Sequence, residues 1–169
     1  MWITDAKRHP EPRQGGAGSR GFTLIELLIA IAIIGILATV ASVSLMQARR
    51  RARDTKRVAD IQQIRNALLI YSNTRATYPV AVGEGGVELG GPDARCLDDS
   101  DQGFKAGGCA GLVIMERVPR ESFGDSEYQY MSSAGSGTYA LSFILEGAVG
   151  DLPGGNCAAT PGSITCISP

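Results

Sequence analysis

The chain has very little histidine, and it lacks the residue sets on which most enzymatic sites depend. Among its 169 residues the only histidine is His9, close to the N-terminus. The sequence contains no Ser/His/Asp set, no phosphate-binding loop of the Gly-Lys-Ser/Thr kind and no strong metal-binding pattern. We therefore predict that the protein is not an enzyme, and we expect neither catalytic residues nor a cofactor.

A large excess of positive charge is also missing, because the formal net charge is only −1. A general nucleic-acid-binding protein carries a clear basic excess, so no specific nucleic-acid binding is expected. Residues 1–21 nevertheless hold four basic residues against two acidic ones, and the remainder of the chain is acidic. The prolines and glycines of residues 10–18 leave no apolar periodicity there, which predicts an unstructured leader.

Charge is almost absent from the segment that follows. From Phe22 to Met46 the sequence is apolar apart from a single charged residue, Glu26. About 20 apolar residues span the hydrocarbon core of a bilayer as a helix, so residues 22–41 predict a transmembrane helix. The basic residues in front of it favour a cytoplasmic leader, with the body of the protein on the other side of the membrane. A carboxylate inside such a helix is costly, which makes Glu26 a candidate functional residue.

The residues around the start of the apolar segment form a specific motif. The sequence from Arg20 to Leu28 reads RGFTLIELL, and it closely resembles the prepilin peptidase recognition sequence of type IV pilins and type II secretion pseudopilins. The resemblance implies cleavage between Gly21 and Phe22, methylation of the new N-terminus at Phe22, and a role for Glu26 in assembly. It also implies the inner membrane, prepilin peptidase, a pilus or secretion assembly machinery and other copies of the chain as partners.

Physical chemistry supports the assembly role of Glu26. Cleavage creates an ammonium group at Phe22, and burying that charge in an apolar filament core would be expensive. A Glu26 carboxylate from a neighbouring subunit compensates the ammonium, and each charge then offsets the desolvation cost of the other. Two other interpretations of the segment remain: a secretory signal peptide cleaved near residues 39–41, and a plain membrane anchor for an external protein.

The helix is expected to continue well past the membrane. Residues 47–73 contain no proline or glycine, and an apolar stripe with spacings of three and four residues predicts an amphipathic helix. The stripe consists of Val58, Ile61, Ile64, Leu68 and Tyr71. A basic run at residues 49–57 precedes it, and this run has four possible roles: a solvated helix face, contact with lipid headgroups, contact with acidic surfaces of other subunits, or DNA binding.

Cysteine is confined to the second half of the chain, at Cys96, Cys109, Cys157 and Cys166. An even number of cysteines in a glycine-rich region of an exported protein favours disulfides, and a zinc site is the alternative. We expect the sequence-local pairs Cys96–Cys109 and Cys157–Cys166, each of which closes a short loop. Three nearby acids, Asp98, Asp99 and Asp101, form a candidate calcium site, although they follow no recognisable calcium-loop pattern.

The clearest β-strand signal lies late in the chain. Residues 128–131 and 138–146 alternate between apolar and polar side chains on either side of a glycine-containing turn, which predicts a β-hairpin that covers the helical stripe. Residues 80–111 are expected to form a long loop with at most short structure. Residues 112–118 predict a short helix or strand, and a further strand at 163–167 ends an otherwise loop-like tail.

We therefore predict an α+β fold, in which a long N-terminal helix packs its second half on a small antiparallel sheet. The expected divisions are a leader at residues 1–21, a transmembrane and polymerisation helix at 22–46, an amphipathic helix at 47–75 and a loop and sheet region at 76–169. The resemblance implies a structural subunit that leaves the inner membrane for an extracellular or periplasmic filament. The alternatives are a pseudopilin of type II secretion and a membrane-anchored binding module that does not polymerise.

Overall fold

The computed structural model describes residues 21–81, 86–121, 127–135 and 137–167. The predicted leader therefore lies outside the described residues, apart from Gly21. The chain divides into two compact units, at residues 1–42 and 43–169. The elements in chain order are α1 (Leu24–Arg75), β1 (Val87–Glu88), β2 (Cys96–Asp98), β3 (Phe104–Lys105), β4 (Val113–Met115), β5 (Gln129–Met131), β6 (Ala140–Leu145), β7 (Gly155–Ala159) and β8 (Ile164–Ile167).

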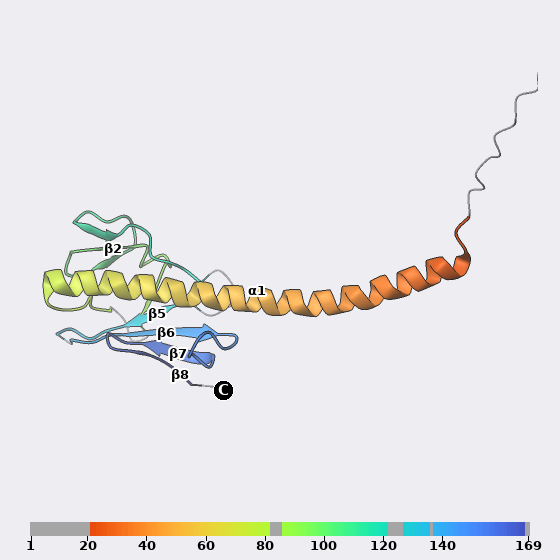
Figure 1. Ribbon diagram of the computed structural model, residues 1–169. Helices are drawn as coiled ribbons and strands as arrows, with labels where there is room; N and C mark the ends of the chain where they lie inside the picture. Colours follow the sequence, from red (N-terminus) through yellow and green to blue (C-terminus); the bar gives the residue numbers. More distant parts are fainter. Residues whose placement is uncertain (1–20, 82–85, 122–126, 136, 168–169) are drawn as a thin grey trace, which may run out of the picture. The chain divides into compact units, whose positions relative to one another are not determined.

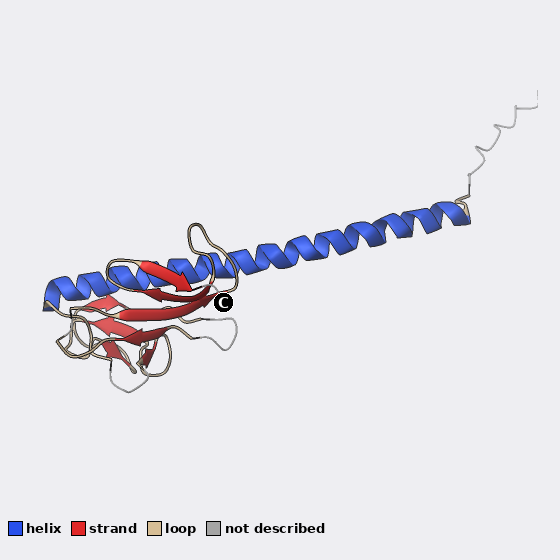
Figure 2. Cartoon of the chain, turned by 90° about the horizontal axis from the view of Figure 1, so that it is seen from below, coloured by secondary structure: helices blue, strands red, loops and turns tan. Residues whose placement is uncertain are grey.

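The second unit contains two antiparallel sheets. The larger sheet has the strand order β1-β5-β6-β7-β8, and the smaller has the order β3-β2-β4. Figure 1 shows the yellow-green part of α1 between β2 on one side and β5 to β8 on the other. Figure 2, seen from below, shows strands lying along this part of the helix. This arrangement confirms the predicted α+β class, with one long helix packed on antiparallel sheets.

The core of this unit forms between the helical stripe and the strands. Ile61, Ile64 and Leu68 are fully buried and Tyr71 is 2% exposed, so the three- and four-residue spacing does turn one helix face inward. Val58 is partly buried against the same cluster. The strands and loops contribute the other large members of the cluster: Leu89, Leu97, Phe104, Met115, Tyr128, Tyr130, Tyr139, Leu141, Phe143 and Leu145.

The predicted hairpin is present as β5 and β6. Tyr130 lies opposite Leu141 in the antiparallel register, and both side chains are fully buried. Along β6 the buried residues Leu141, Phe143 and Leu145 alternate with more exposed ones, as a strand with one core-facing side requires. The hydroxyl group of Tyr130 also donates to the carbonyl oxygen of Pro79 at 2.6 Å, which fastens the chain just beyond the helix to the sheet.

The region after Gly150 is more ordered than the sequence predicts. The expectation of a loop-like tail is wrong for Gly155–Ala159, because this segment forms β7 between β6 and β8. A short strand near residues 163–167 is found as β8. Glycine, asparagine and alanine are weak strand formers, so β7 exists because it pairs on both edges and not because of local propensity.

Both disulfides close sequence-local loops. Cys96 is bonded to Cys109, and Cys157 is bonded to Cys166. The described part of the chain contains no free cysteine. The second disulfide joins directly opposed residues of β7 and β8, so it fastens the edge strand of the larger sheet to its neighbour.

Candidate functional site at the start of the helix

Thr23 and Glu26 close the first turn of α1 with three hydrogen bonds. The backbone amide and the hydroxyl group of Thr23 donate to Oε2 of Glu26 at 2.9 and 2.8 Å. The amide of Glu26 donates to the hydroxyl oxygen of Thr23 at 3.3 Å. This reciprocal pattern is a capping box, which pairs amide groups that the first helical turn leaves without intrahelical partners. The Thr-Leu-Ile-Glu sequence therefore fixes the start of the helix at Leu24.

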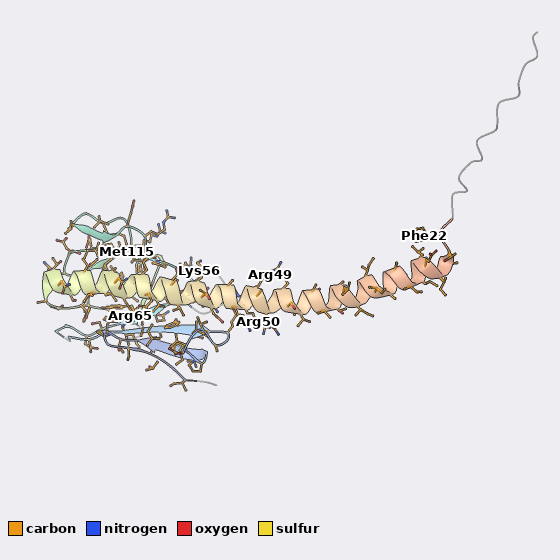
Figure 3. The ribbon with its side chains drawn as sticks, in the orientation of Figure 1. Phe22, Arg49, Arg50, Lys56, Arg65 and Met115 are labelled. Carbon is orange, nitrogen blue, oxygen red and sulfur yellow. A yellow bond between two sulfur atoms is a disulfide. The ribbon has the colours of Figure 1, made fainter. Side chains whose placement is uncertain are left out.

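The two residues in front of the cap are exposed and lie outside the helix. Phe22 is 85% exposed and is labelled at the start of the helix in Figure 3. A Cβ atom placed on Gly21 would meet no heavy atom within 4 Å, and Gly21 is not among the glycines with positive φ. The fold thus gives no reason for a glycine at position 21, and the peptide bond between Gly21 and Phe22 is accessible.

The first half of α1 is apolar on every side and is not covered by the rest of the chain. All side chains from Leu24 to Met46 are exposed. The helix is long and apolar enough to cross a membrane, and none of its most apolar stretch is buried, unlike the core helix of a soluble protein. An uncovered apolar surface of this size is unfavourable in water, so lipid or other protein must cover it.

The carboxylate of Asp98, one of the candidate calcium ligands, is hydrogen-bonded to its own loop through both oxygens. Its carboxylate accepts hydrogen bonds from the amide and hydroxyl of Ser100 at 3.0 and 2.5 Å, and from the amides of Ala110 and Gly111 at 3.3 and 3.5 Å. Burial opposes the ionisation of Asp98, but these hydrogen bonds outweigh it and lower the pKa of the carboxyl group. Asp98 therefore organises the loop that the Cys96–Cys109 disulfide closes.

The other two candidate ligands serve different partners. Asp99 accepts a hydrogen bond from the amide of Leu112 at 2.8 Å, and Asp101 forms an ion pair with Arg75 at the end of α1. Within the described ranges, no three His, Cys, Asp or Glu side chains are grouped closely enough to hold a metal ion. The three aspartates are thus neighbours in sequence whose carboxylates do not meet at one point.

Comparisons with known proteins agree with the motif at the helix start. Residues 17–42 match the prokaryotic N-terminal methylation motif. Over 133 residues the chain is 31% identical to type II secretion system core protein G of Aeromonas hydrophila, covering 77% of this chain and 85% of that protein. Over 118 residues it is 30% identical to the same component of Vibrio cholerae, covering 70% of this chain and 74% of that protein.

This chain belongs to the type IV pilin and type II secretion pseudopilin family. It is 65% identical over 37 residues to the type IV wide pilus major component of Thermus thermophilus, which covers 22% of this chain and 28% of that protein. No solved structure matches the chain. Family members are structural subunits, and the apolar helix with its methylation motif fits anchoring in a membrane.

The body of this pilin-family subunit also contains a buried ion network that the sequence does not reveal. Asp54 and Arg57 lie on α1 and are only 1% and 6% exposed. The carboxylate of Asp54 accepts hydrogen bonds from Nη1 of Arg57 at 2.7 Å and from the amides of Glu146 and Gly147, both at 2.9 Å. One buried carboxylate thereby joins the helix to the chain that leaves β6.

Two further carboxylates complete the network. Arg57 donates to Glu121 at 2.5 Å and to Glu146 at 3.1 Å, and Arg53 donates to both carboxylate oxygens of Glu146 at 2.7 and 2.5 Å. The interpretation of the basic run as a solvated helix face is therefore wrong for Arg57, which is buried, whereas Arg53 stays partly exposed while it pairs with Glu146. The i,i+3 spacing of Asp54 and Arg57 was the only local signal, because Glu121 and Glu146 are far away in sequence.

Proposed function

We propose that this chain is a prepilin that is cut between Gly21 and Phe22 and methylated at Phe22. The mature subunit then polymerises through its N-terminal helix into a type IV pilus-like filament. The observation that carries this proposal is the geometry of the helix start. A carboxylate in the first turn of a wholly exposed apolar helix lies next to an exposed Gly21–Phe22 bond.

The cleavage step is supported by the fact that the fold does not require a glycine at position 21. Gly21 has open space around it and is not among the glycines with positive φ, so the fold places no constraint on which residue stands at this position. A peptidase that recognises the absence of a side chain before the cut bond would supply that constraint instead. The helix begins at Leu24, behind the capping box, which leaves Gly21 and Phe22 exposed and outside the helix, where an enzyme can bind them.

The assembly step is supported by the second oxygen of the Glu26 carboxylate, Oε1. Oε2 accepts from Thr23, and among the described residues Oε1 has no hydrogen-bond partner. In a filament the exposed apolar helices cover one another, and Oε1 accepts a hydrogen bond from the N-terminal ammonium of a neighbouring subunit. Each charge then compensates the other in an apolar surrounding, and axial misplacement leaves both unpaired.

The subunit's partners in this proposal are other copies of the chain, prepilin peptidase, the inner membrane and the assembly machinery. A second candidate function, a pseudopilin of type II secretion, is favoured by the identity to core protein G over most of the chain. The two functions share the cleavage and assembly steps. They differ in whether the filament leaves the cell surface or stays within the envelope.

The test is mass spectrometry of the native N-terminus in two fractions, sheared surface fibres and washed envelopes. A chain that starts at N-methyl-Phe22 in sheared fibres supports a surface pilus. The same terminus in envelopes alone supports a pseudopilin. A chain that starts at Met1 or Ser42 in every fraction refutes the cleavage proposal.

Glu26→Ala tests polymerisation separately from processing. We expect this variant to be cleaved and inserted in the membrane but not to assemble. Glu26→Gln is the matched control for charge, because its amide oxygen can still accept from Thr23 while the negative charge is gone. Normal assembly of both variants would refute the assembly role of Glu26. A wild-type chain that is found only as an inserted monomer, with both variants behaving in the same way, would instead support a membrane-anchored module that does not polymerise.

A further inference from the structure

Three consecutive arginines, Arg49, Arg50 and Arg51, follow the apolar segment on α1, and we refer to them as the arginine collar. All three are exposed. Successive residues of an α-helix point about 100° apart, so the collar spreads over roughly 200° of the helix circumference. Figure 3 shows Arg49 and Arg50 projecting from different sides of α1. The collar is thus a partial ring around the helix and not a single basic face.

The collar differs from the basic residues that follow it. Arg53 and Arg57 are held by carboxylates of the body. Within the part of the chain that the structure describes, no acidic group forms an ion pair with any collar arginine. The folded subunit therefore presents three uncompensated positive charges at one level of the helix.

The position of the collar matches the depth of lipid phosphates. The apolar run from Phe22 to Met46 spans roughly 37 Å as a helix, whereas the hydrocarbon core of a bilayer is about 30 Å thick. The residues just after Met46 therefore emerge among the headgroups. Arginine side chains adjust their depth along an apolar surface and bind phosphate oxygens through two N–H groups at once.

We propose that the arginine collar binds the phosphate groups of anionic phospholipids at the membrane surface from which the body emerges. The partial ring favours lipid over a neighbouring protein, because lipid headgroups surround a helix whereas a protein partner covers one face. Each basic residue near an anionic membrane surface adds attraction, and three together select anionic over zwitterionic lipid. This binding requires membrane insertion only, so it does not depend on cleavage or polymerisation.

Electron spin resonance of labelled lipids around the full chain tests this proposal. The protein is placed in phosphatidylcholine vesicles with a trace of spin-labelled phosphatidylglycerol or spin-labelled phosphatidylcholine. We expect labelled phosphatidylglycerol to be enriched at the protein boundary by roughly threefold or more. The combined variant Arg49→Gln, Arg50→Gln, Arg51→Gln should reduce this preference to near parity. Lysine at the same three positions should retain most of it, because the charge is kept.

A charge-matched control removes three positive charges from the body instead. Arg95→Gln, Lys105→Gln and Arg117→Gln together change the net charge equally and should leave the lipid preference intact. Equal loss in this control would overturn the proposal, because the preference would then follow total charge and not the collar. A Glu26→Ala subunit, which is not expected to polymerise, should keep the full lipid preference. The lipid result therefore does not depend on whether the polymerisation proposal is correct.

Two further outcomes would overturn lipid binding by the collar. Unchanged lipid preference in the glutamine variant would show that other residues select the lipid. Unchanged preference combined with loss of filament assembly would assign the collar to the acidic surface of a neighbouring subunit.

Discussion

At the start of α1, Thr23 and Glu26 cap the helix of their own chain, and this role needs no partner. The capping box gives one oxygen of the Glu26 carboxylate two hydrogen bonds within its own chain. A carboxylate with internal donors is cheaper to place beside apolar surroundings than a bare one, because part of its lost hydration is replaced. The same residue can therefore be tolerated in a membrane-anchored monomer and still offer its second oxygen to a neighbour.

Thr23→Ala separates the cap from the charge. Loss of the hydroxyl cap should destabilise the first helical turn by about 1 kcal/mol, while the Glu26 carboxylate remains. We expect lower protection of the first-turn amides in hydrogen exchange and a reduced but measurable filament yield. Thr23→Ser keeps the hydroxyl group and is the control. Complete loss of assembly in Thr23→Ala would contradict a role for Glu26 that rests mainly on its charge.

The ion network makes Glu146 a source of pH-dependent stability. Hydrogen bonds from Arg53 are the main cause that lowers the pKa of Glu146 to about 2, from an ordinary value of 4.5. A carboxyl group with a lowered pKa in the folded state stabilises the fold when it is ionised. That contribution is complete above about pH 4.5 and is lost as the pH falls toward 2.

Glu146→Gln is therefore expected to matter at neutral pH and progressively less in acid. The free energy of unfolding of the wild type should exceed that of the variant at pH 7, and the two should converge between pH 4.5 and 2. Denaturant unfolding at several pH values measures the difference. The quantity to follow is the difference in unfolding free energy between the two proteins. The reason is that Asp60, whose pKa is raised by burial, changes the stability of each protein with pH in the opposite direction. A constant gap across this pH range would contradict the assigned role.

Elements with a strong local pattern could be predicted from the sequence, and elements made by distant pairing could not. Residues 47–73 lack helix breakers and carry an apolar stripe, and α1 runs without a break from Leu24 to Arg75. The β5–β6 hairpin follows from alternation across a turn. By contrast, β7 has weak strand propensity and depends on both of its neighbours.

The candidate site divides in the same way. The residues at the helix start could be found because the proposed cleavage and assembly roles and the observed capping box all lie in one short contiguous sequence from Gly21 to Glu26. The ion network could not be found, because Arg57 meets carboxylates that lie 64 and 89 residues further along the chain. The capping box itself had a readable signal, a threonine followed three residues later by a glutamate.

The Cys157–Cys166 disulfide should matter most for the edge of the larger sheet. In a chain-entropy model, closing a loop of this length stabilises the fold by about 3 kcal/mol. Replacing both cysteines by serine should lower the free energy of unfolding and the hydrogen-exchange protection of β8. The pair Cys96→Ser and Cys109→Ser is the matched control, and it should leave β8 protection largely unchanged. Equal loss of β8 protection in both variants would contradict a local effect.

At the scale of the whole chain, two parts of the sequence require different surroundings. The first part of α1 exposes apolar side chains throughout and needs lipid or other helices. The buried core uses residues from Asp54 onward, and none of its members comes from residues 22–46. The division into two compact units agrees with this separation. The body should therefore carry its own folding information.

A chain that begins at Gln47 tests this independence. We expect it to be a soluble monomer with both disulfides, and to unfold in one cooperative transition at nearly the same temperature as the full chain in detergent. Because Leu68 is fully buried, Leu68→Ala should cost 2–5 kcal/mol in both proteins, which would show that the transition reports the same core. Aggregation of the shortened chain, or loss of its transition, would instead mean that the apolar half of the helix is needed to fold the body.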